Sequence, residues 1–378
     1  MEKINYKTEW SLGLIYGVDS KEASEELIQK KREESIEAVG SFFSKWKERS
    51  DYLEKPEVLK EALDDYEKLM NHQGINSHEA YYFFLKGELD KEGNVTKAKL
   101  SKAEEVALKL SNELNFFEIG LSKIPTKNQK LFLESQILID YNHYLERLFL
   151  FGKHTLSESE EKIMSLKSAS SHDMWVKMTE QFLSSETAKI INEKGEKELV
   201  PFSATINLIS SPNKKTRDRA AKELNRILKK YINSAEAEIN AILNNKKVND
   251  ELRNYLNPED SRHLSNDIGA DVVDSMISAI SKRFDLSERY YKLKAGLFGV
   301  KKLKYHERNI EFGKLNKEFE FDYTIELISK ILLSIDQSFF EVFKNMFENG
   351  QVDVFPKKGK RSGACNLHNL KSQPGYVL

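Results

Sequence analysis

The scarcity of helix-breaking residues is the feature that most restricts the fold of this chain. Only 7 prolines and 17 glycines interrupt 378 residues, and the long stretches between them are rich in Lys, Glu, Leu and Ala. These residues favour helices, whereas proline breaks a helix and glycine weakens it. We therefore expect a mainly α-helical protein, with 39% hydrophobic residues to fill a sizeable core.

Two segments carry the start signals of amphipathic helices. Ser157 lies three residues before Glu160, a spacing that predicts a capping box at the start of a helix. In the segment that begins SPNKKTRDRAAKEL, Ser211 is the predicted N-cap and Pro212 lies in the predicted first turn. Both segments continue with apolar residues at helical spacing, so both are predicted to pack one face against a core.

Two later stretches repeat this apolar spacing. The pattern predicts helical structure over 271–299 and again over 322–347, with a break in the second stretch near Asp336. The apolar face expected in the first stretch begins with Val272, Met276, Ile280 and Phe284.

Strand signals are few and short. They occur around Val200, around Tyr305, and over 351–356, where Val352 and Val354 alternate with polar residues. We therefore expect a small β-sheet appended to a helical body. A change in composition near residue 195 predicts a helical N-terminal domain over 1–195 and a second domain over 196–378.

Composition also excludes several classes of partner. The 59 Lys and Arg residues nearly cancel the 60 Asp and Glu residues, so no net charge attracts nucleic acid or an anionic membrane. No segment approaches the roughly 20 apolar residues of a membrane span, and the first residues lack the apolar run of a signal peptide. Cys365 is the only cysteine, which excludes an internal disulfide and favours a reducing, cytoplasmic location.

Histidine spacing argues against a helical zinc motif in these residues. Such a motif places two histidines one turn apart, whereas the two nearest histidines here are six residues apart. The segment HEAYY begins like HExxH at His78, but Tyr82 stands at the second histidine position. We interpret His78 as a surface or capping residue.

The segment PKKGKRSGACNLH near the end of the chain suggests three other chemistries. A phosphate loop would need glycine at Val354 and Ser or Thr after Lys360, and neither is present. Cys365 and His368 resemble a nucleophile pair but lack an identifiable third group to orient them. The basic cluster has no interleaved aromatic residues and is interpreted as a solvated turn rather than a nucleic-acid site; it comprises Lys357, Lys358, Lys360 and Arg361.

Four segments, taken together, span nearly the whole chain: TEWSLGLIYG, SPNKKTRDRAAKEL, the long stretch from RHLSNDIGADVVDSM to KLKYHERN, and VDVFPKKGKRSGA followed by SQPGYVL. In these segments the chain resembles the oligoendopeptidase F family of thimet-like zinc metallopeptidases. The resemblance implies a largely helical peptidase fold with a small sheet beside a deep cleft, in which a zinc-activated water cuts short peptides. In the family, the HExxH helix and the further zinc ligand follow the segment that corresponds to KRSGA and GYVL here.

The resemblance implies that residues 196–378 are the N-terminal half of the metallopeptidase domain, which is incomplete here, and that this chain ends, at Leu378, before the metal site. We therefore expect no catalytic or metal-binding residue in these 378 residues, no zinc bound by this chain alone, and no hydrolysis by it. The segment that remains is cleft-side strand in the family, where an extended peptide could add a strand. The predicted substrate-binding residues are Ser362, Gly363, Ala364, Cys365 and Tyr376.

Two departures from the family pattern occur in this segment. The family usually has an aromatic residue and then cysteine after the Gly-Ala pair, whereas Cys365 and Asn366 stand there, and Gly375 replaces a larger residue. Three interpretations remain open: one chain of a split peptidase whose second chain carries HExxH, a catalytically dead helical module that binds peptides, or a remnant with exposed core faces.

Overall fold

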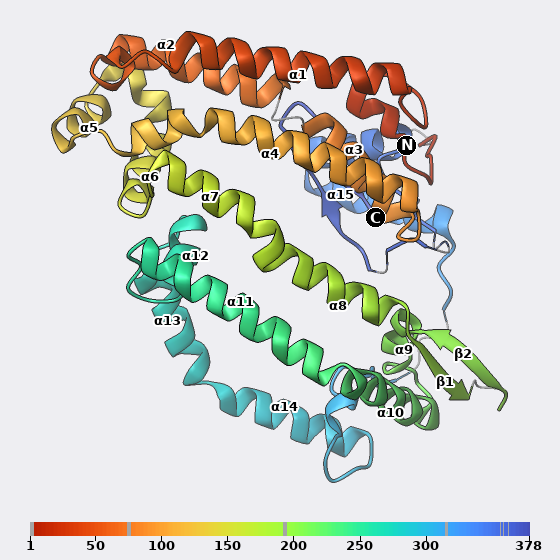
Figure 1. Ribbon diagram of the computed structural model, residues 1–378. Coiled ribbons are helices and arrows are strands. Elements are labelled where there is room, and N and C mark those ends of the chain that lie inside the picture. The colour runs from red at the N-terminus through yellow and green to blue at the C-terminus, as the bar shows by residue number, and fades with distance from the viewer. Residues whose placement is uncertain are drawn as a thin grey trace. The chain divides into compact units, whose positions relative to one another are not determined.

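The chain divides into two compact units, and the computed structural model describes residues 4–73, 77–191, 195–313, 317–355, 357, 359–361 and 363–378. Unit 1 comprises Met1–Phe149 and Lys317–Leu378, and unit 2 comprises Leu150–Asn316 (Figure 1). Both units are mainly helical with very short strands, which confirms the predicted fold class. The functional division at residue 195 stays a prediction.

Unit 1 is a helical assembly in which α1, α2 and α4 run alongside one another (Figure 1). Its α-helices are α1 (Glu25–Trp46), α2 (Pro56–Lys68), α3 (Ser77–Leu89), α4 (Asn94–Ser122), α5 (Thr126–Leu133), α6 (Asn142–Gly152), α15 (Phe321–Ile335) and α16 (Gln337–Glu348). α6 continues past Phe149 into the second unit. The main core lies between α1, α2 and α4, where Trp46, Leu59 and Phe117 are fully buried.

A second core in unit 1 joins the beginning and the end of the described chain. The 3₁₀-helix Leu12–Tyr16, helix α3 and the strand pair β3 (Asn366–Leu367) and β4 (Tyr376–Val377) contribute to it. Trp10 and Tyr376 meet there edge to face, with ring centroids 5.4 Å apart. This core positions the C-terminal segment.

Unit 2 contains a hairpin and helices that pack along one another. Strands β1 (Thr187–Ile191) and β2 (Lys197–Pro201) pair antiparallel, with Ala188 opposite Val200. Its α-helices are α7 (Glu158–Ser168), α8 (Met174–Ser184), α9 (Phe202–Leu208), α10 (Lys214–Lys230), α11 (Ile232–Leu252), α12 (Asp260–Ser265), α13 (Ala270–Ser281) and α14 (Phe284–Leu297). Helix α10 packs on β1 and helix α11 packs on α8, as Figure 1 shows.

The predicted helix starts and the predicted helix break are confirmed in part. The capping box of Ser157 and Glu160 is confirmed at the start of α7. The predicted N-cap Ser211 is wrong by two residues, because the Asn213 side chain accepts the N–H groups of Lys215 and Thr216 and so begins α10 after Pro212. The break at Asp336 is confirmed, and its carboxylate caps α16 by accepting the Ser338 N–H at 2.8 Å.

The strand predictions hold in part. The strand around Val200 is confirmed as β2. The strand around Tyr305 is wrong: Tyr305–Glu307 is a 3₁₀-helix, closed by the Glu307 carboxylate accepting the Lys304 N–H at 3.0 Å. Within the described residues 351–355, the stretch around Val352 forms a single parallel bridge, to Val377, and Pro356 lies outside the described residues.

The apolar face predicted for 271–299 is present but not buried. The stretch is two helices, α13 and α14, and the first four side chains of the face are 51% to 63% exposed; they are Val272, Met276, Ile280 and Phe284. Among the described helices, none is both long enough and apolar enough to span a membrane.

Candidate functional site

Four of the five residues predicted to bind substrate lie in or just before the C-terminal strand pair. Ser362 lies outside the described residues, whereas Gly363, Ala364 and Cys365 lead into β3 and Tyr376 begins β4. The Cys365 N–H donates to the Leu378 carbonyl at 3.1 Å, and the Leu378 N–H donates to the Cys365 carbonyl at 2.9 Å. The N–H and C=O groups of Cys365 therefore point toward the β4 segment and are both used by Leu378.

β4 is the inner strand of this segment and β3 is the outer one. On the far side of β4, the Val377 N–H donates to the Gln351 carbonyl at 2.8 Å, and the Asp353 N–H donates to the Val377 carbonyl at 2.9 Å. Successive residues of a strand direct their N–H and C=O groups to opposite sides. Ala364 and Asn366 therefore direct theirs away from β4, and within the described part of the chain no strand pairs with that edge.

Tyr376 anchors the strand pair and does not offer its ring to a ligand. Its side chain is fully buried, and its hydroxyl donates to the Ser11 carbonyl at 2.8 Å. Burial raises the pKa of this phenol well above its ordinary value. The Trp10 indole N–H donates to the Val377 carbonyl at 2.9 Å, so the strand pair is fixed to the N-terminal segment.

The basic residues of this segment are ion-paired within the chain. The Lys360 ammonium lies 2.6 Å from the fully buried Asp353 carboxylate, and the Arg361 guanidinium lies 3.1 Å from the buried Glu88. Hydrogen bonds from Lys21 and Lys357 lower the pKa of Glu9 to about 2. The interpretation of this cluster as a solvated turn is wrong for Lys360, whose side chain is only 8% exposed because it pairs with the buried Asp353. Lys357 and Arg361 are exposed, and Lys358 lies outside the described residues.

Cys365 and His368 do not form a nucleophile pair. Cys365 is half-buried beside the second core, and no hydrogen bond links its sulfur to the exposed His368 ring in the described part of the chain. A Cβ on Gly375 would lie 3.6 Å from His368 Cδ2, an ordinary contact distance. The family departure at Gly375 therefore leaves room beside this ring.

One group in unit 2 brings together side chains of the kind that bind metals. Asp218, His306 and Glu307 place their ligand atoms within 4.8 Å of one another, and no other such group occurs within the described ranges. His306 Nε2 lies 2.8 Å from Asp218 Oδ1. Sequence analysis missed this group because its members lie 88 residues apart and no local motif links them.

The group does not fit a zinc ion, because protein cations already occupy its oxygens. Burial acts to raise the pKa of Asp218, but hydrogen bonds from Lys214, His306 and Lys304 outweigh it and hold that pKa far below its ordinary value. Glu307 is likewise held by Lys214 at 3.2 Å. A divalent cation would have to displace these ammonium groups, so we derive no metal chemistry from this group.

Comparisons with known proteins agree with this architecture. A family model described as Oligopeptidase F matches residues 121–187. An oligoendopeptidase F homolog of Lactococcus lactis subsp. lactis is 24% identical over 368 residues, which are 96% of this chain and 59% of the relative. The group B oligopeptidase PepB of Streptococcus agalactiae is 23% identical over 294 residues, 76% of this chain and 48% of the relative.

Solved structures share the fold. The crystal structure of oligoendopeptidase-F from Enterococcus faecium matches with a TM-score of 0.66 at 18% identity, over 87% of this chain and 67% of that one. The fold is therefore that of the mainly helical oligopeptidases. The chain is similar to oligoendopeptidase F-type proteins in sequence and in fold, which confirms the resemblance seen in its sequence. It spans about half to three-fifths of the length of the curated relatives named above.

Proposed function

We propose that these 378 residues form the helical frame and a peptide-binding edge of an oligoendopeptidase F-type peptidase that acts on short peptides. The observation that carries this proposal is the sequence match over 96% of the chain to an oligoendopeptidase F homolog. The outward edge of β3 supports the proposal as well, because it has main-chain groups to which an extended peptide could bind. With its single cysteine, the protein suits a reducing, cytoplasmic compartment.

An extended peptide would bind this edge by main-chain hydrogen bonds. Such strand addition needs an outer strand with N–H and C=O groups that no neighbour uses. Ala364 and Asn366 supply them at an exposed position of the segment. Because Tyr376 and the ion pairs of Lys360 and Arg361 fix the segment beforehand, little ordering entropy opposes binding.

Peptide hydrolysis would need zinc ligands that these residues do not supply. The resemblance implies a zinc-activated water, yet the printed sequence contains no HExxH and the Asp218 group does not fit the metal. A polypeptide of only residues 1–378 should therefore bind peptides without cutting them. Hydrolysis would require a further polypeptide segment that carries HExxH, supplied by a second chain in the split-peptidase form of the proposal.

Helix α15 offers a surface on which such a segment could pack. Tyr323, Leu327, Ile331 and Ile335 are spaced by four residues and are 38% to 64% exposed. Residues at this spacing share one helix face, and exposed apolar stripes of this kind mark interaction surfaces. The relatives carry additional chain, which supports a polypeptide as the occupant. The expected result is that a purified HExxH-bearing partner co-elutes with this chain and that Ile331→Glu abolishes co-elution.

The peptide-binding edge can be tested without any metal. In fluorescence anisotropy with a labelled short peptide, Asn366→Pro should weaken binding, because proline removes the N–H that points away from β4. Asn366→Ala is the matched control, since it keeps that N–H and should bind as the unaltered chain does. Equal binding by the proline variant would rule out the edge as the binding surface.

A second measurement tests the expected lack of hydrolysis. Zinc content is measured on the purified 378-residue chain together with cleavage of a quenched fluorescent peptide. Substoichiometric zinc and no turnover are expected. Stoichiometric zinc with turnover by this chain alone would contradict the proposal that the metal ligands lie elsewhere.

A further inference from the structure

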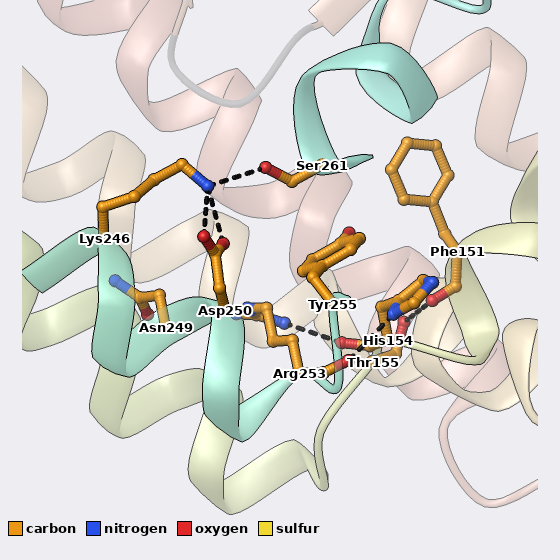
Figure 2. Close-up of a pocket in the computed structure, with 9 residues that line it drawn as sticks. All are labelled: Phe151, His154, Thr155, Lys246, Asn249, Asp250, Arg253, Tyr255 and Ser261. Carbon is orange, nitrogen blue, oxygen red and sulfur yellow. Dashed lines mark hydrogen bonds and ion pairs between the residues drawn. The ribbon is translucent and has the colours of Figure 1, made fainter. Parts of the chain in front are cut away.

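Unit 2 contains a pocket of about 330 Å³ that the proposed function does not use. Its lining comes from the end of α6 and the residues that follow it, from the C-terminal end of α11 and the residues that follow it, and from Ser261 of α12 (Figure 2). Its volume lies at the small end of the range for ligand sites, which is roughly 300 to 1,000 Å³. The pocket therefore suits one side chain or a small molecule.

Two stacked rings form a rigid platform in this pocket. The ring centroids of His154 and Tyr255 are 4.0 Å apart with planes inclined by 12°. His154 Nδ1 lies 2.8 Å from the Arg253 carbonyl oxygen, and because a carbonyl only accepts, Nδ1 carries the proton. Arg253 in turn donates to both oxygens of Glu161, at 2.6 and 2.7 Å. The His154 ring is therefore fixed by the Arg253 backbone, and the Arg253 side chain is itself fixed by two hydrogen bonds to Glu161.

The charges around the pocket are balanced within the chain. The Lys246 ammonium lies 2.7 and 2.5 Å from the two Asp250 oxygens and donates to Ser261 Oγ at 3.1 Å. Arg253 is neutralised by Glu161. No lining cation is left to bind an anion, so the pocket favours an uncharged ligand.

Three polar atoms around the platform are not used by described residues. In the neutral imidazole that has its proton on Nδ1, His154 Nε2 carries a lone pair. The Asn249 amide donates an N–H to the Asn245 carbonyl, and no described residue donates to its oxygen. The Tyr255 hydroxyl makes no hydrogen bond within the described ranges, and burial raises the pKa of this phenol, so it stays neutral. Two acceptors therefore lie beside an aromatic surface.

We propose that this pocket binds an aromatic side chain that carries its own O–H or N–H donor, namely a tyrosine or tryptophan of a bound peptide. The ring would pack against Tyr255 and Phe151, and its donor would reach His154 Nε2 or the Asn249 oxygen. Contact with Tyr255 and Phe151 would bury the ligand ring, and the two acceptors would favour a ring that carries an O–H or N–H donor. Only the source of the ligand, a peptide, rests on the proposed function.

The test uses a neutral probe and needs no peptidase activity. N-acetyl-L-tyrosinamide is titrated into the 378-residue chain and followed by ligand-observed NMR. Saturable binding with a Kd in the millimolar range is expected for so small a ligand. N-acetyl-L-phenylalaninamide, which lacks the hydroxyl, should bind about 3- to 10-fold more weakly, as the loss of one hydrogen bond predicts.

Variants locate the binding. Tyr255→Ala should abolish saturable binding, while Asn249→Ala keeps the platform and should reduce the preference for the tyrosine probe over the phenylalanine probe. Tyr305→Ala removes a tyrosine that is 81% exposed and should leave binding unchanged. Absence of saturable binding, equal affinity for both probes, or identical binding by the Tyr255 and Asn249 variants would overturn the proposal. None of these outcomes bears on peptide binding at β3.

Discussion

The hydroxyl of Tyr376 provides a sharp test of how the candidate site is held in place. This phenol is fully buried and donates to the carbonyl of Ser11, a residue that is 8% exposed. Tyr376→Phe keeps the ring and its contact with Trp10 but removes the donor. The Ser11 carbonyl then keeps only its longer hydrogen bond, from the Leu14 N–H at 3.3 Å.

The expected loss of unfolding free energy is about 1 kcal/mol. A typical hydrogen bond contributes roughly 0.5 to 1.5 kcal/mol net, and the Ser11 carbonyl is not left unpaired, because it still accepts the Leu14 N–H. For a unit of this size, each kcal/mol lowers the melting temperature by roughly 2 to 4 °C. Tyr376→Ala also removes the ring and should cost about 3 to 5 kcal/mol.

Urea unfolding followed by tryptophan fluorescence measures this loss. Trp10 is a suitable probe because its ring centroid lies 5.4 Å from that of Tyr376. Tyr323→Phe is the control in the same unit, because Tyr323 is 45% exposed and its change should stay within about 0.5 kcal/mol. If Tyr376→Phe costs no more than this control, the strand pair is not anchored through the hydroxyl and the argument fails.

Two further predictions concern the same unit. Hydrogen bonds from Lys21 and Lys357 lower the pKa of Glu9 from 4.5 to about 2, so the stabilisation is present above pH 4.5 and is lost as the pH falls toward 2. Glu9→Gln should flatten this part of the acid-unfolding curve, and an unchanged curve would contradict the pairing. Gly350 has φ +68°, and an added Cβ would lie 2.6 Å from Ser11 Oγ, so Gly350→Ala should lower the thermal midpoint, whereas a midpoint equal to that of the unaltered chain would show that the loop adapts.

The sequence predicts those features whose causes lie within a few residues. The Ser157 capping box needs only Glu160, three positions away, and it forms as predicted. At Tyr305, by contrast, the alternation of apolar residues suggests a strand, but Glu307 is drawn into a turn by the Lys304 N–H and by Arg217, which lies 90 residues earlier. A partner so distant in sequence leaves no periodic signal.

Parts of the candidate site were likewise predictable from the sequence, and parts were not. The segment from Gly363 to Cys365 is recognisable by family resemblance, and the structure adds which side of it is unpaired. The burial of Tyr376 was not predictable, because its partner Ser11 lies 365 residues away. The pocket at Tyr255 gives no sequence signal either, since its lining comes from three separate segments.

The Asp218 group shows why side chains of the right type do not by themselves make a metal site. Arg217 is 5% exposed, and its guanidinium donates to the Ser211 carbonyl at 2.9 Å and to Glu307 at 3.3 Å. Removing Glu307 would leave a buried cation without its partner, which costs about 3 to 5 kcal/mol in comparable pairs. A metal ion bound to the Glu307 oxygens would also deprive Arg217 of this carboxylate. The loss of that contact would offset part of the binding free energy of the metal. The charges of this group therefore join α10 to the segment around Tyr305, and the chemistry of the family must come from ligands other than these.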